Sequence, residues 1–102
     1  TLRTGNLELD ALAREARITG DPEAIPLSGR EFSVLEHLMR QSGKVVPKEL
    51  IEQSLYGGGE DLSSNSVEVL IHRVRKKLTD MGTDAEIHTV RGVGYMITPK
   101  SA

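Results

Sequence analysis

The architecture of this chain can be inferred from Ser66-Val67-Glu68-Val69-Leu70-Ile71-His72-Arg73-Val74-Arg75-Lys76-Lys77-Leu78. Apolar residues recur in this segment at the spacing of a helix, about 100° per residue, so they share one face that must pack against a core. This stripe consists of Val67, Ile71, Val74 and Leu78, with Leu70 at its edge. We therefore predict an amphipathic helix over residues 66–78.

The opposite face of this helix is polar and basic. It carries Asn65, Val69, His72, Arg73 and Lys76, with Arg75 and Lys77 on its flanks. No residue from His72 to Lys77 is acidic. Such a helix suits the major groove of DNA, which admits a helix and presents the hydrogen-bonding edges of the bases. A basic helix face is more often simply solvated, so this feature alone leaves both interpretations open.

The composition indicates one soluble domain. The chain has 102 residues, of which 37% are hydrophobic and 27% are charged, enough for a single core. It has no cysteine, which excludes a disulfide framework and thiolate metal sites. No apolar run approaches the roughly 18–20 residues that span a bilayer, and the first residues do not resemble a signal peptide. We expect one intracellular domain over residues 1–102, and a first residue other than Met indicates a piece of a longer protein.

The net charge of −2 argues against nucleic-acid binding when taken alone, because Lys and Arg dominate phosphate binding. The charges are nevertheless unevenly distributed. Residues 1–62 hold seven Lys and Arg against eleven Asp and Glu, whereas residues 63–102 hold six against four. A DNA-binding surface needs a local positive face, so an acidic remainder of the chain does not exclude such a surface.

The first part of the chain predicts short antiparallel strands. Apolar and polar residues alternate over Leu7–Ala11 and again over Ala13–Thr19. Gly20-Asp21-Pro22 supplies a turn before a third extended segment at residues 24–28. Because Pro26 cannot donate to a ladder, the third strand should be an edge strand or end near this residue.

Two helices are predicted between these strands and the helix at residues 66–78. Ser28 and Glu31 have the spacing of a capping box and open the first helix, which Gly43 closes. Its buried stripe should consist of Phe32, Leu35, Leu38 and Met39. Pro47 fits the first turn of the second helix, which ends at residues 56–59 before a loop to about residue 64. The buried side of this second helix should consist of Leu50, Ile51 and Leu55.

A hairpin follows the helix at residues 66–78. Arg91-Gly92-Val93-Gly94 places two glycines where the chain must reverse. Strand-forming side chains flank the reversal at Thr89, Val90, Tyr95 and Ile97. A phosphate-binding loop is a poorer interpretation of these glycines, since no helix follows and no third glycine completes the fingerprint. The second and third helices therefore form a helix-turn-helix with a long turn, followed by a hairpin of the kind called a wing.

Three motifs occur in order along the chain. They are Leu27-Ser28-Gly29-Arg30-Glu31-Phe32-Ser33-Val34-Leu35, the helix at residues 66–78, and Thr89-Val90-Arg91-Gly92-Val93-Gly94-Tyr95. Together they resemble the first helix, the recognition helix and the wing of the DNA-binding effector domains of OmpR/PhoB-type response regulators. Ser64-Asn65-Ser66-Val67-Glu68-Val69 is similar to the subgroup that contains the PmrA- and QseB-like regulators. The resemblance implies an α+β fold, a winged helix-turn-helix with an N-terminal antiparallel four-stranded sheet, three helices and a C-terminal β-hairpin wing.

The resemblance also implies which residues meet DNA when the third helix enters the major groove and the wing enters the minor groove. Base contacts are expected from Asn65, Val69, His72 and Arg73. Val69 can touch a thymine methyl group, and Arg73 can pair with guanine. Phosphate contacts are expected from Arg75, Lys76, Lys77 and Thr89. Arg91 is expected to enter the minor groove, where A·T-rich segments concentrate negative potential.

The family also implies partners. We expect sequence-specific binding of double-stranded DNA for transcriptional regulation, with head-to-tail dimers on direct repeats. A receiver domain is expected upstream, with a sensor histidine kinase as its partner, and the loop at residues 56–63 corresponds to a segment that contacts RNA polymerase in some relatives. Because the sequence offers no carboxylate cluster, metal-ligand set or activated nucleophile, we expect no enzyme activity, cofactor or metal. The protein should act in the cytoplasm, away from membranes.

Several positions have an alternative interpretation. Val69 is otherwise an ordinary surface apolar residue, and Arg91 a solvated turn residue. Glu68 and His72 form a helix-surface pair more readily than the start of a metal site. Leu70 stands where related sequences often carry His, so the target sequence cannot be transferred. A winged helix that binds protein would have no reason to concentrate cations on its third helix, which favours DNA.

Overall fold

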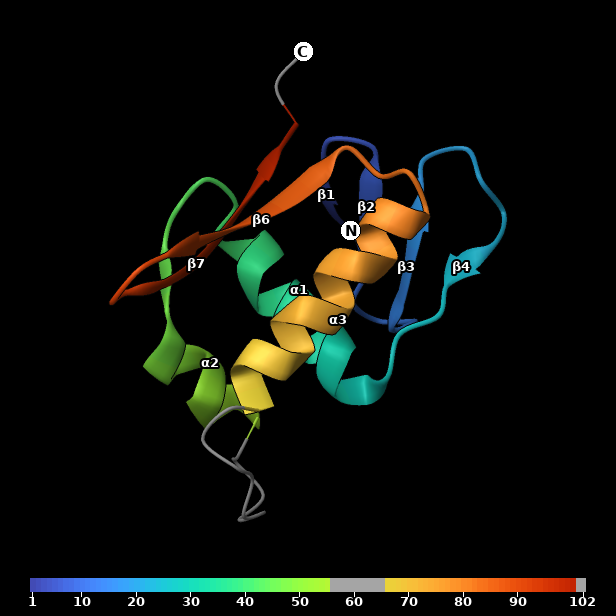
Figure 1. Ribbon diagram of the computed structural model, residues 1–102. Coiled ribbons are helices and arrows are strands. Elements are labelled where there is room, and N and C mark those ends of the chain that lie inside the picture. Colours follow the sequence, from blue (N-terminus) through green and yellow to red (C-terminus); the bar gives the residue numbers. More distant parts are fainter. Residues whose placement is uncertain (56–65, 101–102) are drawn as a thin grey trace.

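The chain folds into two antiparallel sheets and three helices, and the computed structural model describes residues 1–55 and 66–100 (Figure 1). In chain order the elements are β1 (Leu2–Thr4), β2 (Leu7–Asp10), β3 (Glu15–Ile18), β4 (Ala24–Ile25), α1 (Gly29–Arg40), β5 (Val46–Pro47), α2 (Lys48–Leu55), α3 (Ser66–Asp80), β6 (Ala85–Val90) and β7 (Gly94–Pro99). The predicted winged helix, with its four-stranded N-terminal sheet, three helices and C-terminal hairpin, is confirmed.

The N-terminal sheet has the strand order β1-β2-β3-β4. The predicted alternation places Leu7, Leu9 and Ala16 in the core, where each is at most 1% exposed. β4 is an edge strand that ends at Ile25, directly before Pro26, as predicted. β1 has three residues, too few to show a period, and only the family resemblance implied a fourth strand.

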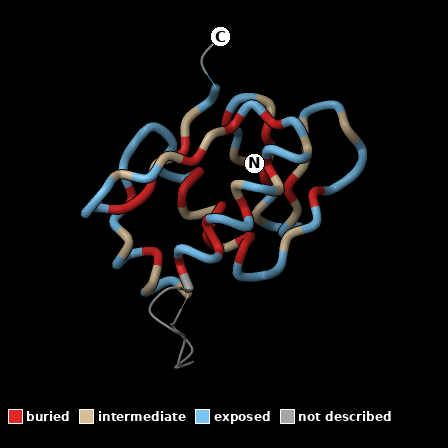
Figure 2. The backbone as a smooth tube through the Cα atoms, viewed as in Figure 1, coloured by how far each residue is buried: buried red, intermediate tan, exposed pale blue. Residues whose placement is uncertain are grey.

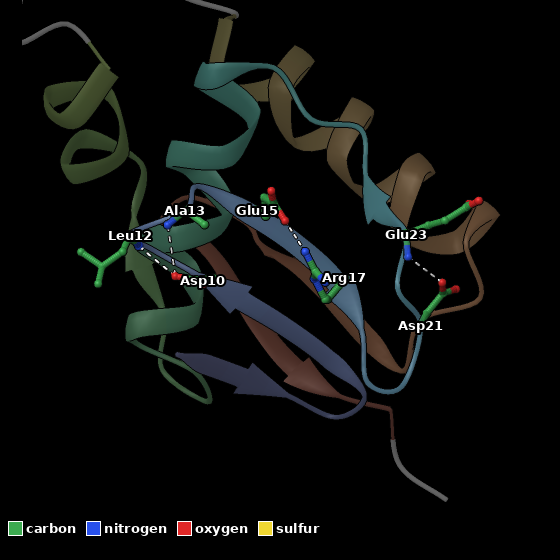
Figure 3. A network of polar contacts seen from close by, with 7 residues as sticks. All are labelled: Asp10, Leu12, Ala13, Glu15, Arg17, Asp21 and Glu23. Carbon is green, nitrogen blue, oxygen red and sulfur yellow. Dashed lines mark hydrogen bonds and ion pairs between the residues drawn. The ribbon is translucent and has the colours of Figure 1, made fainter.

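The exposed face of this sheet carries charged side chains that pair with one another. Arg3 contacts Glu8 on the neighbouring strand. Arg17 contacts Glu15 on its own strand (Figure 3). The carboxylate of Asp10 accepts hydrogen bonds from two backbone N–H groups in the turn between β2 and β3, each at 3.1 Å (Figure 3). Each of these charges is therefore matched within the sheet or its turn.

α1 begins at the predicted capping box. The Ser28 hydroxyl accepts a hydrogen bond from the N–H of Glu31 at 3.2 Å, and the Glu31 carboxylate accepts one from the N–H of Ser28 at 2.8 Å. The predicted stripe is buried and consists of Phe32, Leu35, Leu38 and Met39. The helix ends at Arg40, and the chain turns at Gly43, whose φ of 83° favours glycine.

The start of α2 corrects two predictions. Pro47 lies in β5, which pairs with β7, and α2 begins one residue later at Lys48. A strand of two residues has no pattern of its own, so its pairing with a distant strand is not visible in the sequence. Leu50 is 45% exposed instead of buried, because the buried side of α2 is centred on Ile51, which is 0% exposed. Leu55 is half-buried against the core.

α3 packs its predicted stripe into the core. The four stripe residues are each at most 2% exposed, and they are Val67, Ile71, Val74 and Leu78. Leu70, at the edge of the stripe, is 7% exposed. Figure 2 shows buried residues concentrated where α1, α3 and the two sheets meet. The helix is therefore held along one side, which leaves the opposite side to solvent.

The wing consists of β6 and β7, which pair along their length and reverse at residues 91–93, as predicted (Figure 1). Gly92 has a φ of 78° and allows the reversal. Gly94 has another role, because a Cβ atom at this position would lie 2.0 Å from the carbonyl oxygen of Val46. Only a residue without a side chain permits this close approach of β7 to β5.

Candidate nucleic-acid interface

The predicted base-contacting residues lie on the outward face of α3. Val69 is 39% exposed, and His72 and Arg73 are exposed one turn further along. Within residues 1–55 and 66–100, neither the side chain of His72 nor that of Arg73 has a hydrogen bond or ion pair. Asn65, the fourth predicted base contact, lies outside the described residues. The three described side chains are therefore open to a binding partner.

Lys76 continues this face toward the C-terminal end of α3. Its ammonium lies 3.4 Å from the carboxylate of Asp80, and both side chains are exposed. A surface pair of this kind contributes roughly 0–1 kcal/mol, so it holds Lys76 only weakly.

Arg91 lies at the tip of the wing. It is exposed, and no partner for its guanidinium is found in the part of the chain that the structure describes. Val93, two residues on, is 52% exposed. The reversal is closed by a hydrogen bond of 3.0 Å from the N–H of Val93 to the carbonyl of Val90. The tip therefore presents a cation beside an apolar side chain on a closed turn.

Lys77 lies on a different side of α3, the flank that faces α1. Its Nζ is 2.6 Å from Oε1 of Glu31, a side chain that is only 5% exposed. Burial raises the pKa of Glu31, but the hydrogen bonds from Lys77 and Ser28 outweigh burial, so the pKa lies below its ordinary value of 4.5. The same carboxylate thus completes the cap of α1 and neutralises Lys77.

Arg75 and Thr89, both predicted to contact phosphate, contact each other. Nε of Arg75 donates to the carbonyl of Ile87 at 3.1 Å, and Nη2 donates to Oγ1 of Thr89 at 3.1 Å. Arg75 is half-buried between α3 and β6. The structure therefore brings the two residues together as partners of one another.

An ion pair that the sequence did not indicate joins α2 to α3. Lys48, the first residue of α2, contacts Glu68 in the first turn of α3. The hydrogen bond from Lys48 lowers the pKa of Glu68, and the same contact raises the pKa of Lys48. Glu68 is thus paired with Lys48 and not with His72, the partner expected from helix spacing.

This ion pair lines an open groove of about 760 Å³ between α2, the start of α3 and the wing. Glu49 and Glu52 of α2 also line the groove, opposite Arg91 of the wing. Burial raises the pKa of Tyr95, which forms part of the wall. Because the α2 side of the groove is acidic, an anion is better accommodated on the outward face of α3 and at the wing tip.

The part of the chain that the structure describes contains neither a metal-ligand group nor a membrane-spanning helix. Among residues 1–55 and 66–100, no group of three or more His, Asp or Glu side chains is placed to hold a metal ion. In the same ranges, no helix combines the length and the apolar character needed to cross a membrane. Nε2 of His88 lies 2.8 Å from the hydroxyl of Thr98, within the hairpin.

The sequence matches a family of known proteins. The family described as "Transcriptional regulatory protein, C terminal" matches residues 22–97. The transcriptional regulatory protein QseB of Escherichia coli O157:H7 is 46% identical over 99 residues, which cover 97% of this chain and 42% of QseB. The response regulator protein PmrA of Pseudomonas aeruginosa is 41% identical over 93 residues, which cover 91% of this chain and 39% of PmrA. The chain thus spans about two-fifths of the length of these curated relatives.

Solved structures share the arrangement of helices and sheets. The DNA-binding domain of Klebsiella pneumoniae RstA, solved in complex with the RstA box, has a TM-score of 0.78 at 32% identity, with 97% of both chains covered. The DNA-binding domain of CpxR from E. coli has a TM-score of 0.78 at 28% identity, covering 99% of this chain and 98% of CpxR. The DNA-binding domain of AdeR, with a TM-score of 0.82 at 22% identity over 96% of this chain and 99% of that chain, supports the fold alone.

Proposed function

This chain belongs to the OmpR/PhoB-type family of C-terminal, DNA-binding domains of transcriptional regulatory proteins, and we propose that it inserts α3 into the major groove of DNA and the wing into the adjacent minor groove. The observation that carries this proposal is the two-sided helix α3, whose stripe is buried while Val69 and Arg73 are exposed on the opposite face. A helix held by its core presents side chains at fixed positions, which readout of a base sequence requires.

The base-reading roles are assigned by chemistry. Arg73 is proposed to donate two hydrogen bonds to guanine, a contact worth about 1–3 kcal/mol of discrimination between bases. Val69 is proposed to pack against a thymine methyl group. His72 lies on the same exposed face and is proposed to reach a neighbouring base. The role of Asn65 remains a prediction from the family resemblance.

The backbone contacts are assigned by exposure. Lys76 is proposed to contact a phosphate, which positions the helix without reading sequence. Arg91 is proposed to enter the minor groove, whose narrow A·T-rich segments attract arginine. Arg75, Thr89 and Lys77 would have to give up protein partners to reach a phosphate, so we expect smaller contributions from them.

The whole protein is proposed to be a two-component response regulator of which this domain is the non-enzymatic output module. The similarity to QseB and PmrA, and to the RstA domain solved on its DNA box, supports this proposal. A receiver domain upstream and a sensor histidine kinase would control the domain, and head-to-tail pairs would occupy direct repeats. Such a regulator acts on DNA in the bacterial cytoplasm. The expected contact between the loop at residues 56–63 and RNA polymerase falls outside the described residues.

Selection of bound sites from random duplex DNA, followed by a salt titration on the selected site, tests DNA binding. If the three exposed cations Arg73, Lys76 and Arg91 neutralise phosphates, the logarithm of the association constant should fall against that of salt with a slope near −3, at about 0.9 per phosphate. Participation of all five cations predicted from the sequence, which adds Arg75 and Lys77, would steepen the slope to roughly −4.5. Failure to enrich any sequence, or affinity independent of salt, would contradict the proposed function.

A further inference from the structure

Arg75 links the recognition helix to the wing. It lies half-buried on the flank of α3 that faces β6. Its guanidinium donates to the carbonyl of Ile87 through Nε and to the hydroxyl of Thr89 through Nη2, each at 3.1 Å. Both distances are ordinary for N–H···O hydrogen bonds. A single side chain thus contacts two positions of the same strand.

The strand that Arg75 contacts is an edge strand, because the second sheet has the order β5-β7-β6. Ile87 lies opposite Ile97, whose carbonyl accepts a hydrogen bond from Gly43 on the side away from β6. The carbonyl of Ile87 therefore points to the outer edge of the sheet, where no further strand pairs with it. Within residues 66–100, the side-chain hydrogen bonds between α3 and β6 all come from Arg75.

On its other side the wing is held by β5 and α2. The N–H of Lys48 donates to the carbonyl of Val93 at 3.1 Å, and Gly94 lies directly against the backbone of β5. With Arg75 on one side and these contacts on the other, the wing has a fixed place relative to α3. The position of Arg91 relative to the recognition helix is thus set in the free protein.

We propose that Arg75 is a positioning residue, which holds the wing at the distance from α3 at which Arg73 and Arg91 engage DNA together, without contacting phosphate itself. This inference rests on the proposed DNA-binding function. A wing that is ordered in advance avoids the entropy cost of ordering it on binding. Arginine suits the role because its planar guanidinium donates to two acceptors at once, whereas lysine keeps the charge on a single nitrogen.

A double-mutant cycle with Arg75→Lys and Arg91→Ala separates positioning from a phosphate contact. If Arg75 acts through the wing, each single variant should bind the selected site about tenfold more weakly, and the double variant should be little weaker than either. If Arg75 contacts phosphate, Arg75→Lys should bind almost as well as the wild type, and its effect should multiply with that of Arg91→Ala. The second result would overturn the positioning role.

Thr89→Val is a second variant that keeps every charge. Valine has nearly the size of threonine but cannot accept the hydrogen bond from Arg75. We expect affinity to fall about threefold in the wild-type background and to be unchanged in the Arg91→Ala background. Hydroxyl-radical protection of the minor groove should weaken, while protection of the major groove by α3 is retained. Wild-type affinity with full minor-groove protection would contradict the inference, even if Arg75→Lys fails to fold.

Backbone amide NMR relaxation of the free domain separates failure of this inference from failure of DNA binding. Thr89→Val should raise the mobility of residues 90–94 and leave α1 unchanged. If the wild-type domain selects no DNA sequence, the proposed function is wrong. If the mobility of the wing is the same in Thr89→Val as in the wild type, the positioning role is wrong whatever the domain binds.

Discussion

The exposed face of the N-terminal sheet and the outward face of α3 with the wing both carry arginines, but they use them in opposite ways. On the sheet, Arg3 contacts Glu8. Arg17 contacts Glu15 on the same strand (Figure 3). Among the residues that the structure describes, Arg73 and Arg91 have no such partner. The arginines of the sheet are neutralised by neighbouring carboxylates, whereas Arg73 and Arg91 are available to bind an anionic ligand.

This contrast shows that the placement of carboxylates matters more than the net charge of −2. Acidic residues outnumber basic ones before residue 63, where several pair with arginines of the sheet or line the α2 side of the groove. At physiological ionic strength, exposed charges are screened over about 8 Å. Acidic residues on the sheet therefore have little effect on a phosphate at α3.

The largest effect is expected when a carboxylate is introduced beside Arg73, because the outward face of α3 then carries a paired arginine, as the N-terminal sheet does. In Val69→Glu, the new side chain lies one turn before Arg73, the spacing of a helix-surface ion pair. Because the carboxylate neutralises Arg73 and repels phosphates, we expect DNA affinity to fall about a hundredfold or more, roughly 3 kcal/mol. Fluorescence-anisotropy titration with the selected duplex measures the loss.

Val69→Ala is the matched control, since it removes methyl groups without adding charge. Its loss of affinity should be about tenfold or less. Both variants should unfold near the wild-type temperature, because position 69 is exposed and surface substitutions usually change stability by about 0.5 kcal/mol or less. Equal affinities of Val69→Glu and Val69→Ala would show that DNA does not contact this face of α3.

The next largest effect is expected from single arginine-to-alanine variants, which should lower DNA affinity on α3 but not on the sheet. Arg73→Ala should cost about 1–3 kcal/mol on the selected site and relax base preference at one position. Arg17→Ala, on the sheet, should leave DNA affinity unchanged. Lys76→Ala should weaken all sequences evenly and flatten the salt slope by about one unit. Similar losses of base preference in Arg73→Ala and Lys76→Ala would contradict the division between base and phosphate contacts.

Lys77 of α3 resembles the arginines of the sheet, because it forms an ion pair with the carboxylate of Glu31. Glu31→Gln should lower the free energy of unfolding by about 1.5 kcal/mol at neutral pH, since charge-assisted hydrogen bonds are lost. The folded-state pKa of Glu31 lies below 4.5, so its stabilising effect is present above that pH and is lost as the pH falls through the folded pKa. In urea unfolding, the difference between wild type and variant should shrink below pH 4.5. A difference that is constant with pH would exclude this role of the carboxylate.

The smallest effect is expected on the sheet itself. Arg3→Ala removes an exposed ion pair with Glu8 and should change the free energy of unfolding by about 0.5 kcal/mol or less. The change should diminish further in high salt, and DNA affinity should be that of the wild type. A loss of DNA affinity in this variant would show that the sheet, despite its paired charges, takes part in binding.

Features that depend on residues a few positions apart were predicted from the sequence. The helical period of α3 identified both its buried stripe and its exposed face. The spacing of Ser28 and Glu31 located the start of α1, and Pro26 located the end of β4. Each of these follows from local backbone chemistry, so no knowledge of distant neighbours was needed.

Features that depend on distant partners were missed. Lys77 and Glu31 are 46 residues apart, and only the packing of α3 on α1 brings them together. The helical period placed Arg75 on a flank of α3, but the edge of β6 that meets this flank is visible only in the fold. Ile51 is buried as predicted, but the exposure of Leu50 depends on which side of α2 packs against the rest of the fold.

The contact between Gly94 and β5 limits how this domain can be re-engineered. A designer who grafts the hairpin tip of another regulator onto this scaffold can exchange the side chains at positions 91 and 93, but position 92 favours glycine because its φ is 78°. Position 94 must stay glycine, because even a methyl group would meet the backbone of Val46 and Pro47. The wing tip can therefore be varied at positions 91 and 93, whereas the glycines at positions 92 and 94 should be kept.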